Sequence, residues 1–214
     1  MNKKLLMVLG STAAVAAVSI GGTLALFSDA KSATGDFAAG TLCITSERND
    51  GDTTPGPMFY ITAEQGQTPD GLLGTLPTGV WAPGDSVTRT LNVYNPRSCS
   101  TMDAWLTAVS ARLTEGIPNQ YVQMADELTV VISTPYGEGS NAPTVTVAEA
   151  PLRDFLDGPV PIRYPDGSKI KVHLTGTRQM QFNVTFNRDA GNEFQDKTLV
   201  VDFIVHAEQM RNNP

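Results

Sequence analysis

The chain has few side chains that could support catalysis, and they are widely separated. Its two histidines, His173 and His206, belong neither to an HExxH motif nor to a pair at helical i, i+4 spacing. Those arrangements hold zinc in many proteases. No GxSxG motif is present, so the sequence offers no recognisable nucleophile elbow. We therefore predict no catalytic residue, no metal site and no cofactor, and we interpret both histidines as solvated strand residues.

One acidic segment has the pattern of half a calcium-binding loop. Asn49-Asp50-Gly51-Asp52 places three oxygen-bearing side chains around a glycine. The remaining ligands and the closing glutamate of such a loop are missing. We therefore prefer a flexible acidic loop as the interpretation.

Cys43 and Cys99 are the only two cysteines. In an exported chain such a pair most often forms one disulfide, and the alternative is two buried free thiols. A bridge would close a loop of about 57 residues and would stabilise the fold by roughly 3–4 kcal/mol on the chain-entropy model. It would join the first strand of the exported chain to the loop that follows residues 81–95.

Four aromatic residues could line a sugar-binding site of the kind that some β-sandwiches carry. They are Trp81, Trp105, Tyr60 and Tyr94. The alternative is that Trp105 lies in the core and Trp81 at its rim. The spacing of these residues does not separate the two interpretations.

The N-terminus has the three parts of a secretory signal peptide. Lys3 and Lys4 are followed by an uncharged run over residues 5–20, and Thr23 and Ala25 supply small residues at the −3 and −1 positions. The run is shorter than the ~20 apolar residues that a spanning helix needs, and no basic cluster follows it. We predict a signal peptide over residues 1–25 with cleavage between Ala25 and Leu26. We prefer this to a retained membrane anchor, so the mature form would be secreted.

The charge of the chain excludes two classes of partner. The full sequence of 214 residues has a formal charge of −7, and without Lys3 and Lys4 the balance is 13 basic against 22 acidic residues, or −9. Nucleic-acid binding needs clustered lysine and arginine, and docking on anionic lipid needs a basic surface. We therefore expect neither partner for the mature chain.

Alternating apolar residues predict strands along most of the chain. In residues 104–113 a strand competes with a helix, and we prefer a strand with Trp105 and Val109 on one face. A single helix is predicted over residues 148–156, where Thr146 and Glu149 would form a capping box. The other predicted strands lie in residues 33–45, 58–62, 87–95, 127–134, 144–147, 168–175, 179–186 and 198–207. About eight or nine strands with one helix indicate an all-β, jelly-roll-type antiparallel β-sandwich over residues 41–214.

Three sequence blocks resemble the TasA/camelysin family of secreted bacterial proteins. The first runs from the pair Gly21-Gly22 through Phe27-Ser28-Asp29 to Phe37-Ala-Ala-Gly-Thr-Leu42. The second is the stretch from Ala82 to Asn95, and the third runs from Asn192-Glu-Phe-Gln195 to Phe203-Ile-Val-His-Ala-Glu-Gln209. The family usually has tryptophan where Leu24 stands, and the two cysteines are not part of its pattern. The resemblance implies a dedicated signal peptidase, a jelly-roll fold, and biofilm-matrix fibres built from N-terminal donor strands.

Residues 26–40 are the predicted donor segment. This stretch is mostly small and polar, so we expect it to bury little within its own domain and to add as a strand to the sheet edge of a neighbouring molecule. A head-to-tail contact of that kind propagates as a homopolymer. The assembly residues that we single out are Leu26, Phe27, Asp29, Phe37 and Gly40.

The sequence therefore predicts a secreted, non-enzymatic fibre subunit with itself as the main partner. Other matrix proteins or polysaccharide are possible further partners. Two alternatives stay open: a camelysin-like cell-surface metalloprotease, and a monomeric sugar-binding or adhesive module. A disordered leader is the alternative for residues 26–40.

Overall fold

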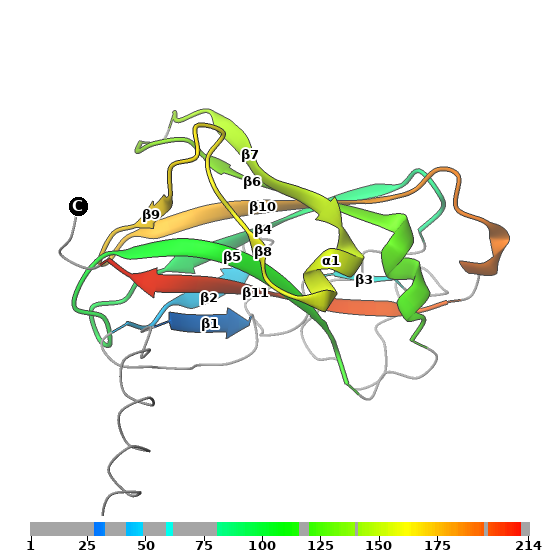
Figure 1. Ribbon diagram of the computed structural model, residues 1–214, viewed down its shortest axis with the longest axis horizontal. Helices are drawn as coiled ribbons and strands as arrows, with labels where there is room; N and C mark the ends of the chain where they lie inside the picture. The colour runs from blue at the N-terminus through cyan, green and yellow to red at the C-terminus, as the bar shows by residue number, and fades with distance from the viewer. Residues whose placement is uncertain are drawn as a thin grey trace, which may run out of the picture.

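The computed structural model describes residues 28–32, 42–48, 59–61, 81–115, 120–139, 141–194 and 197–210. Within them the fold is all-β, with strands paired antiparallel in two sheets and one short α-helix (Figure 1). In chain order the elements are β1 (Ser28–Ser32), β2 (Thr45–Arg48), β3 (Phe59–Ile61), β4 (Ser86–Tyr94), β5 (Ala104–Leu113), the 3₁₀ turn η1 (Val122–Glu127), β6 (Leu128–Pro135), β7 (Thr144–Pro151), α1 (Leu152–Asp157), β8 (Val160–Pro161), β9 (Ile170–Val172), β10 (Thr177–Phe186), the 3₁₀ turn η2 (Asn192–Phe194) and β11 (Leu199–Gln209).

The two sheets differ in the number and order of their strands. The six-stranded sheet has the order β1-β11-β5-β8, with β3 also paired to β11 and β9 also paired to β5. The five-stranded sheet has the order β2-β4-β10-β6-β7. Long strands therefore occupy the centre of each sheet, and most of the short ones lie at the edges.

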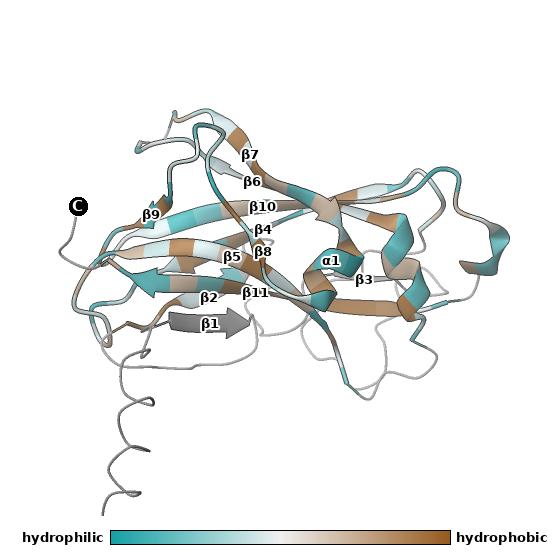
Figure 2. Ribbon diagram, viewed as in Figure 1, coloured by the Kyte–Doolittle hydropathy of each residue, from teal (hydrophilic) through white to brown (hydrophobic). Residues whose placement is uncertain are grey.

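The core lies between the sheets and is built from the alternate residues that face inward. Phe182 on β10 and Phe203 on β11 are fully buried, and their ring centroids are 4.9 Å apart across the two sheets. The inner residues of β4 are Arg89, Leu91 and Val93, as the alternation predicts. In Figure 2, β11 is hydrophobic in its N-terminal part and hydrophilic toward its C-terminal end, in keeping with the continuous burial of Leu199–Phe203.

The helix is shorter than predicted. Residues 148–151 continue β7 and pair with β6, so α1 begins at Leu152 and not at residue 148. The predicted capping box is wrong because Thr146 and Glu149 both lie on β7, and α1 has no side-chain cap. Hydrogen bonding to β6 outweighs the local helix signal in this stretch. The predicted stop is correct: Gly158 follows the last helical residue, and its N–H donates to the Asp154 carbonyl.

A β-bulge changes the face that Trp105 occupies. β5 has the predicted bounds, but Val109 pairs with Val205 and Leu106 with Ala207, so Thr107 is an extra residue on β5. The bulge reverses the alternation, because the side chains before it move to the opposite face. Ala104 and Leu106 are therefore buried, while Trp105 is half-buried on the outer side. The prediction that Trp105 shares a face with Val109 is wrong.

Two other boundaries differ from the predictions. Glu47 and Arg48, assigned to a loop, form the end of β2 because they pair with β4. The strand predicted over residues 168–175 is confined to β9, and Thr175 adopts a positive φ of 65° in the turn that leads to β10. The signal peptide, the cleavage site at Ala25 and Leu26, and the acidic segment 49–52 lie outside the described residues.

Candidate functional site

The outer edge of β11 is covered by two short strands from the N-terminal part of the chain. On its inner side β11 pairs with β5 over almost its whole length. On the other side β1 pairs opposite Ile204–Glu208, and β3 pairs opposite Leu199–Val201. The edge of the longest strand in the sheet is thus completed by segments distant from it in sequence.

The register of β1 places part of the predicted donor segment on this edge. Ser28 lies opposite Glu208, Asp29 opposite Ala207, and the pairing ends with Ser32 opposite Ile204. Residues 28–32 therefore have main-chain partners within their own chain, and the expectation of a segment free of its own sheet does not hold for them. Of the predicted assembly residues only Asp29 is described; Leu26, Phe27, Phe37 and Gly40 lie outside the described residues.

The strand that β1 covers is apolar on both faces for part of its length. Leu199, Val200, Val201 and Phe203 are all buried, and Val205 and Ala207 are buried beyond them. An apolar strand with an unpaired edge is a template for another strand, because its N–H and C=O groups lack partners. β1 supplies those partners over five residue pairs.

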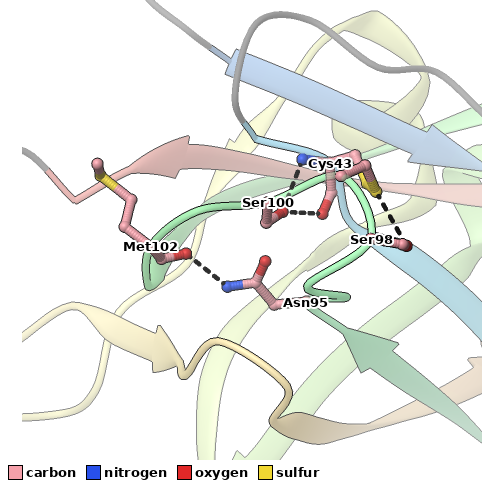
Figure 3. The surroundings of a disulfide bond; sticks show 6 residues. Cys43, Asn95, Ser98, Ser100 and Met102 are labelled. Carbon is pink, nitrogen blue, oxygen red and sulfur yellow. Dashed lines mark hydrogen bonds between the residues drawn. A yellow bond between two sulfur atoms is a disulfide. The ribbon is translucent and has the colours of Figure 1, made fainter.

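A disulfide fixes the chain shortly after the N-terminal segment. Cys43 is bonded to Cys99 with their Cα atoms 5.7 Å apart, which confirms the predicted pairing. The Cys43 N–H donates to Ser100 Oγ at 2.9 Å, and the Ser100 hydroxyl donates to the Cys43 carbonyl at 2.7 Å (Figure 3). Leu42 and Ile44, on either side of the cysteine, are fully buried. The chain is therefore anchored in the core at residues 42–44.

His173, predicted to be a solvated strand residue, is partly exposed but lies just after the end of β9, where it contacts two carboxylates. Its Nδ1 lies 3.2 Å from Asp103 Oδ2, and its Nε2 contacts Glu138 Oε1. Asp103 also accepts from Lys171 Nζ at 2.8 Å, and this hydrogen bond lowers the pKa of the Asp103 carboxyl. The hydrogen bond from His173 likewise lowers the pKa of Glu138. This network ties together the loop before β5, the β6–β7 hairpin and the end of β9.

His206 contacts a serine, Ser110, so we asked whether the two form part of a catalytic triad. Its Nε2 lies 2.8 Å from Ser110 Oγ on the neighbouring strand β5, and burial lowers the pKa of the imidazole, so the ring is neutral near pH 7. A serine–histidine pair needs a third group to orient the imidazole. No carboxylate contacts this ring among the described residues, so the pair gives a hydrogen bond across the sheet surface. Within the same residues no group of three or more histidine, cysteine or acidic side chains is arranged so that it could hold a metal ion.

The aromatic residues of the alternative sugar site are not brought together. Trp81 is buried, with 7% of its surface exposed, whereas the sequence placed it at the rim. Trp105 lies on the outer side of the six-stranded sheet, and Tyr94 is exposed on the five-stranded sheet. Tyr60 belongs to β3, whose side chains are not described.

The sequence did not single out two buried polar groups. Asp202 on β11 is buried, and its Oδ2 lies 3.0 Å from the Arg112 guanidinium on β5. Asn95 is fully buried, and its Nδ2 donates to the carbonyls of Met102 and Val172. Asn95 thus joins the end of β4 to the loop before β5 and to β9. Its position at the end of an alternating strand predicted an inward side chain, but not these partners.

Comparison with known proteins adds no assignment. Neither a protein-family model nor a curated protein matches the chain. In the described part of the chain, no helix is long and apolar enough to cross a membrane.

Proposed function

We propose that this chain is a secreted structural subunit of extracellular matrix fibres, of the TasA/camelysin type, that assembles by exchange of its N-terminal strand. The role is non-enzymatic, and the principal partner is a second copy of the same chain. The observation that carries the proposal is the pairing of β1 with the outer edge of β11. The signal-peptide pattern before residue 26 supports export of the chain.

Strand exchange fits the energetics of this edge better than simple addition. β1 is short, its sequence SDAKS has no large apolar residue, and its pairing within the chain is confined to Ile204–Glu208 on β11. When β1 of one molecule replaces β1 of another, the same backbone hydrogen bonds form again, so the exchange costs little net free energy. At high protein concentration the open form is then captured by neighbours, and a contact that does not close propagates as a filament.

The chain between β1 and the anchored core sets the reach of the exchange. Residues 33–41 connect Ser32 to Leu42. Nine residues can span at most about 30 Å when extended. In the proposed exchange, β1 would reach the equivalent edge of an adjoining molecule within that span while Leu42 stays in its own core.

The finer description of the fold belongs to the same proposal. We propose that the sandwich is of the jelly-roll type. From β4 onward the chain passes from one sheet to the other between β4 and β5, β5 and β6, β7 and β8, β9 and β10, and β10 and β11. Repeated crossing between two antiparallel sheets is typical of jelly rolls.

Deletion of residues 26–40 from the mature protein, 26–214, tests the need for the segment. We expect the deletion variant to form no filaments under conditions in which the intact mature protein forms them, as judged by electron microscopy. Filaments of undiminished number and length would refute the donor role.

A cross-linking experiment tests the register and keeps the proposal falsifiable if the deletion variant misfolds. Chains carrying Ser28→Cys are mixed with chains carrying Glu208→Cys, because these residues are directly opposite in the β1–β11 pairing. We expect disulfide-linked heterodimers after assembly. Ser28→Cys mixed with Thr88→Cys, on the other sheet, is the matched control and should give none. Filaments without the Ser28–Glu208 cross-link would exclude exchange in this register.

A further inference from the structure

The outer face of the five-stranded sheet lacks charged side chains at its centre. We define the polar face as the ten outward positions of the two adjacent strands β4 and β10. None of them is buried, and they pair directly in the order Ser86–Thr185, Thr88–Asn183, Thr90–Gln181, Asn92–Gln179 and Tyr94–Thr177. Protein surfaces are commonly 25–35% charged, so about three charges are expected among ten such positions. Their absence is notable in a chain with 22 acidic residues.

The neutral surface continues onto the flanking strands. On β6, Ser133 lies opposite Gln181 and Thr129 lies opposite Thr185. On β2, Thr45 lies opposite Tyr94, and the first charged side chain, Glu47, is opposite Asn92 at the sheet edge. The uncharged region is therefore wider than two strands.

Hydrogen bonds within the polar face hold its side chains in place. The Asn183 amide donates to Ser86 Oγ and to Thr88 Oγ1, both at 2.8 Å. Thr185 Oγ1 lies within hydrogen-bonding distance of both Ser86 Oγ and the side-chain amide oxygen of Asn183, Oδ1. Thr88 Oγ1 accepts from Asn183, and a hydroxyl can also donate. Side chains that are already ordered lose less conformational entropy when a ligand binds.

We propose that the polar face binds an uncharged polysaccharide. Hydroxyl and amide groups both donate and accept, which matches a polymer that presents hydroxyl groups along its whole length. The strand spacing of ~4.8 Å repeats these groups on the scale of one sugar residue. Tyr94, 37% exposed at the end of the array, adds an aromatic surface on which the apolar face of a sugar ring can stack.

Charge and surface chemistry favour this occupant over two others. The net charge of −7 repels anionic polymers, while a face without charges imposes no such cost on a neutral one. A second copy would bring its own amides and hydroxyls in a fixed register, and each unmatched pair would leave a buried polar group unsatisfied. A hydrated polysaccharide can adjust, with water bridging the gaps. The inference does not depend on strand exchange, since the polar face and the β1 edge belong to different sheets.

Affinity electrophoresis of the mature protein tests the proposal with defined probes. Native gels contain hydroxyethylcellulose, dextran or galactomannan as neutral polymers, and carboxymethylcellulose as the anionic counterpart of the first. We expect retardation by at least one neutral polymer and none by carboxymethylcellulose. No retardation by any neutral polymer, or equal retardation by the anionic one, would overturn the proposal.

Two matched pairs of variants locate the site. Tyr94→Ala and Gln181→Ala should each weaken binding roughly fivefold or more, the loss expected for one hydrogen bond or ring contact. Tyr136→Ala replaces a tyrosine that is 41% exposed elsewhere, and Asn141→Ala replaces an exposed amide in the β6–β7 hairpin; both should change binding less than twofold. Thermal unfolding checks that every variant is folded. Equal losses in the control variants would place binding elsewhere.

Sedimentation of the protein without polymer tests whether the polar face binds a second copy of the chain and not a polysaccharide. If Gln181→Ala abolishes a concentration-dependent dimer and leaves polymer binding unchanged, the polar face is a self-association surface and the proposal fails. Loss of polymer binding with unchanged sedimentation supports it.

Discussion

The Cys43–Cys99 bridge allows a quantitative prediction of stability. It joins residues 56 positions apart, linking the segment before β2 to the loop after β4. On the chain-entropy model, a closed loop of about 57 residues restricts the unfolded chain by about 4 kcal/mol. We therefore expect the double variant Cys43→Ala/Cys99→Ala to lose about 3–4 kcal/mol of unfolding free energy. For a chain of this length that corresponds to a fall in Tm of roughly 6–16 °C.

The assay is urea unfolding, followed by the fluorescence of the two tryptophans, the buried Trp81 and the half-buried Trp105. Wild-type protein in reducing agent provides a second comparison, because it lacks the bridge but keeps both side chains. A similar loss in both samples assigns the effect to the cross-link. A loss below about 1 kcal/mol in both would show that the loop is already restricted in the unfolded state, and would refute the loop-entropy reasoning.

Three further predictions concern other buried groups. Phe155→Ala on α1 should cost about 3–5 kcal/mol in urea unfolding, because this ring is fully buried and packs edge-to-face on Phe203; a cost below 1 kcal/mol would show that α1 does not close the core. Asp202→Ala should cost roughly 1.5–3 kcal/mol because it removes a buried carboxylate that is hydrogen-bonded to the partly exposed Arg112, and a neutral effect would mean that the pair is replaceable by apolar contact. Burial lowers the pKa of His206 in the folded state, so its contribution is present above pH 6.5 and is lost as pH falls through the folded pKa. The His206→Gln variant should therefore lose less stability than wild type between pH 7.5 and 5.5, and parallel curves would contradict the assignment.

Strands with clear alternation were predictable from sequence because their pattern and their burial coincide. β5 has the predicted bounds, and β10 and β11 differ only by a few terminal residues. The inward face of β4 was also correct, including Arg89. The pattern failed where pairing with another strand determined the structure. The bulge at Thr107 has no local sequence signal, since it arises from the register of β5 against β11.

The candidate sites were predictable to different degrees. The disulfide followed from the number of cysteines and the export signal. β1 has no apolar alternation, so its strand conformation depends on backbone groups of β11 that only the fold brings near. The network of Asp103, His173 and Glu138 likewise joins three segments whose separation in sequence gives no local pattern.

The position of the bridge determines how far the proposed exchange can proceed. Release of β1 exposes the edge of β11 over Ile204–Glu208. Release beyond Leu42 would expose Leu42 and Ile44, which are fully buried, at about 1.5–3 kcal/mol each, and would also pull against Cys43. The free-energy cost therefore rises steeply at Leu42, and exchange should stop there. If so, the Cys43 amide, which donates to Ser100, keeps the same hydrogen-exchange protection in filaments as in monomers. Loss of that protection on assembly would mean that the exchanged segment extends into β2.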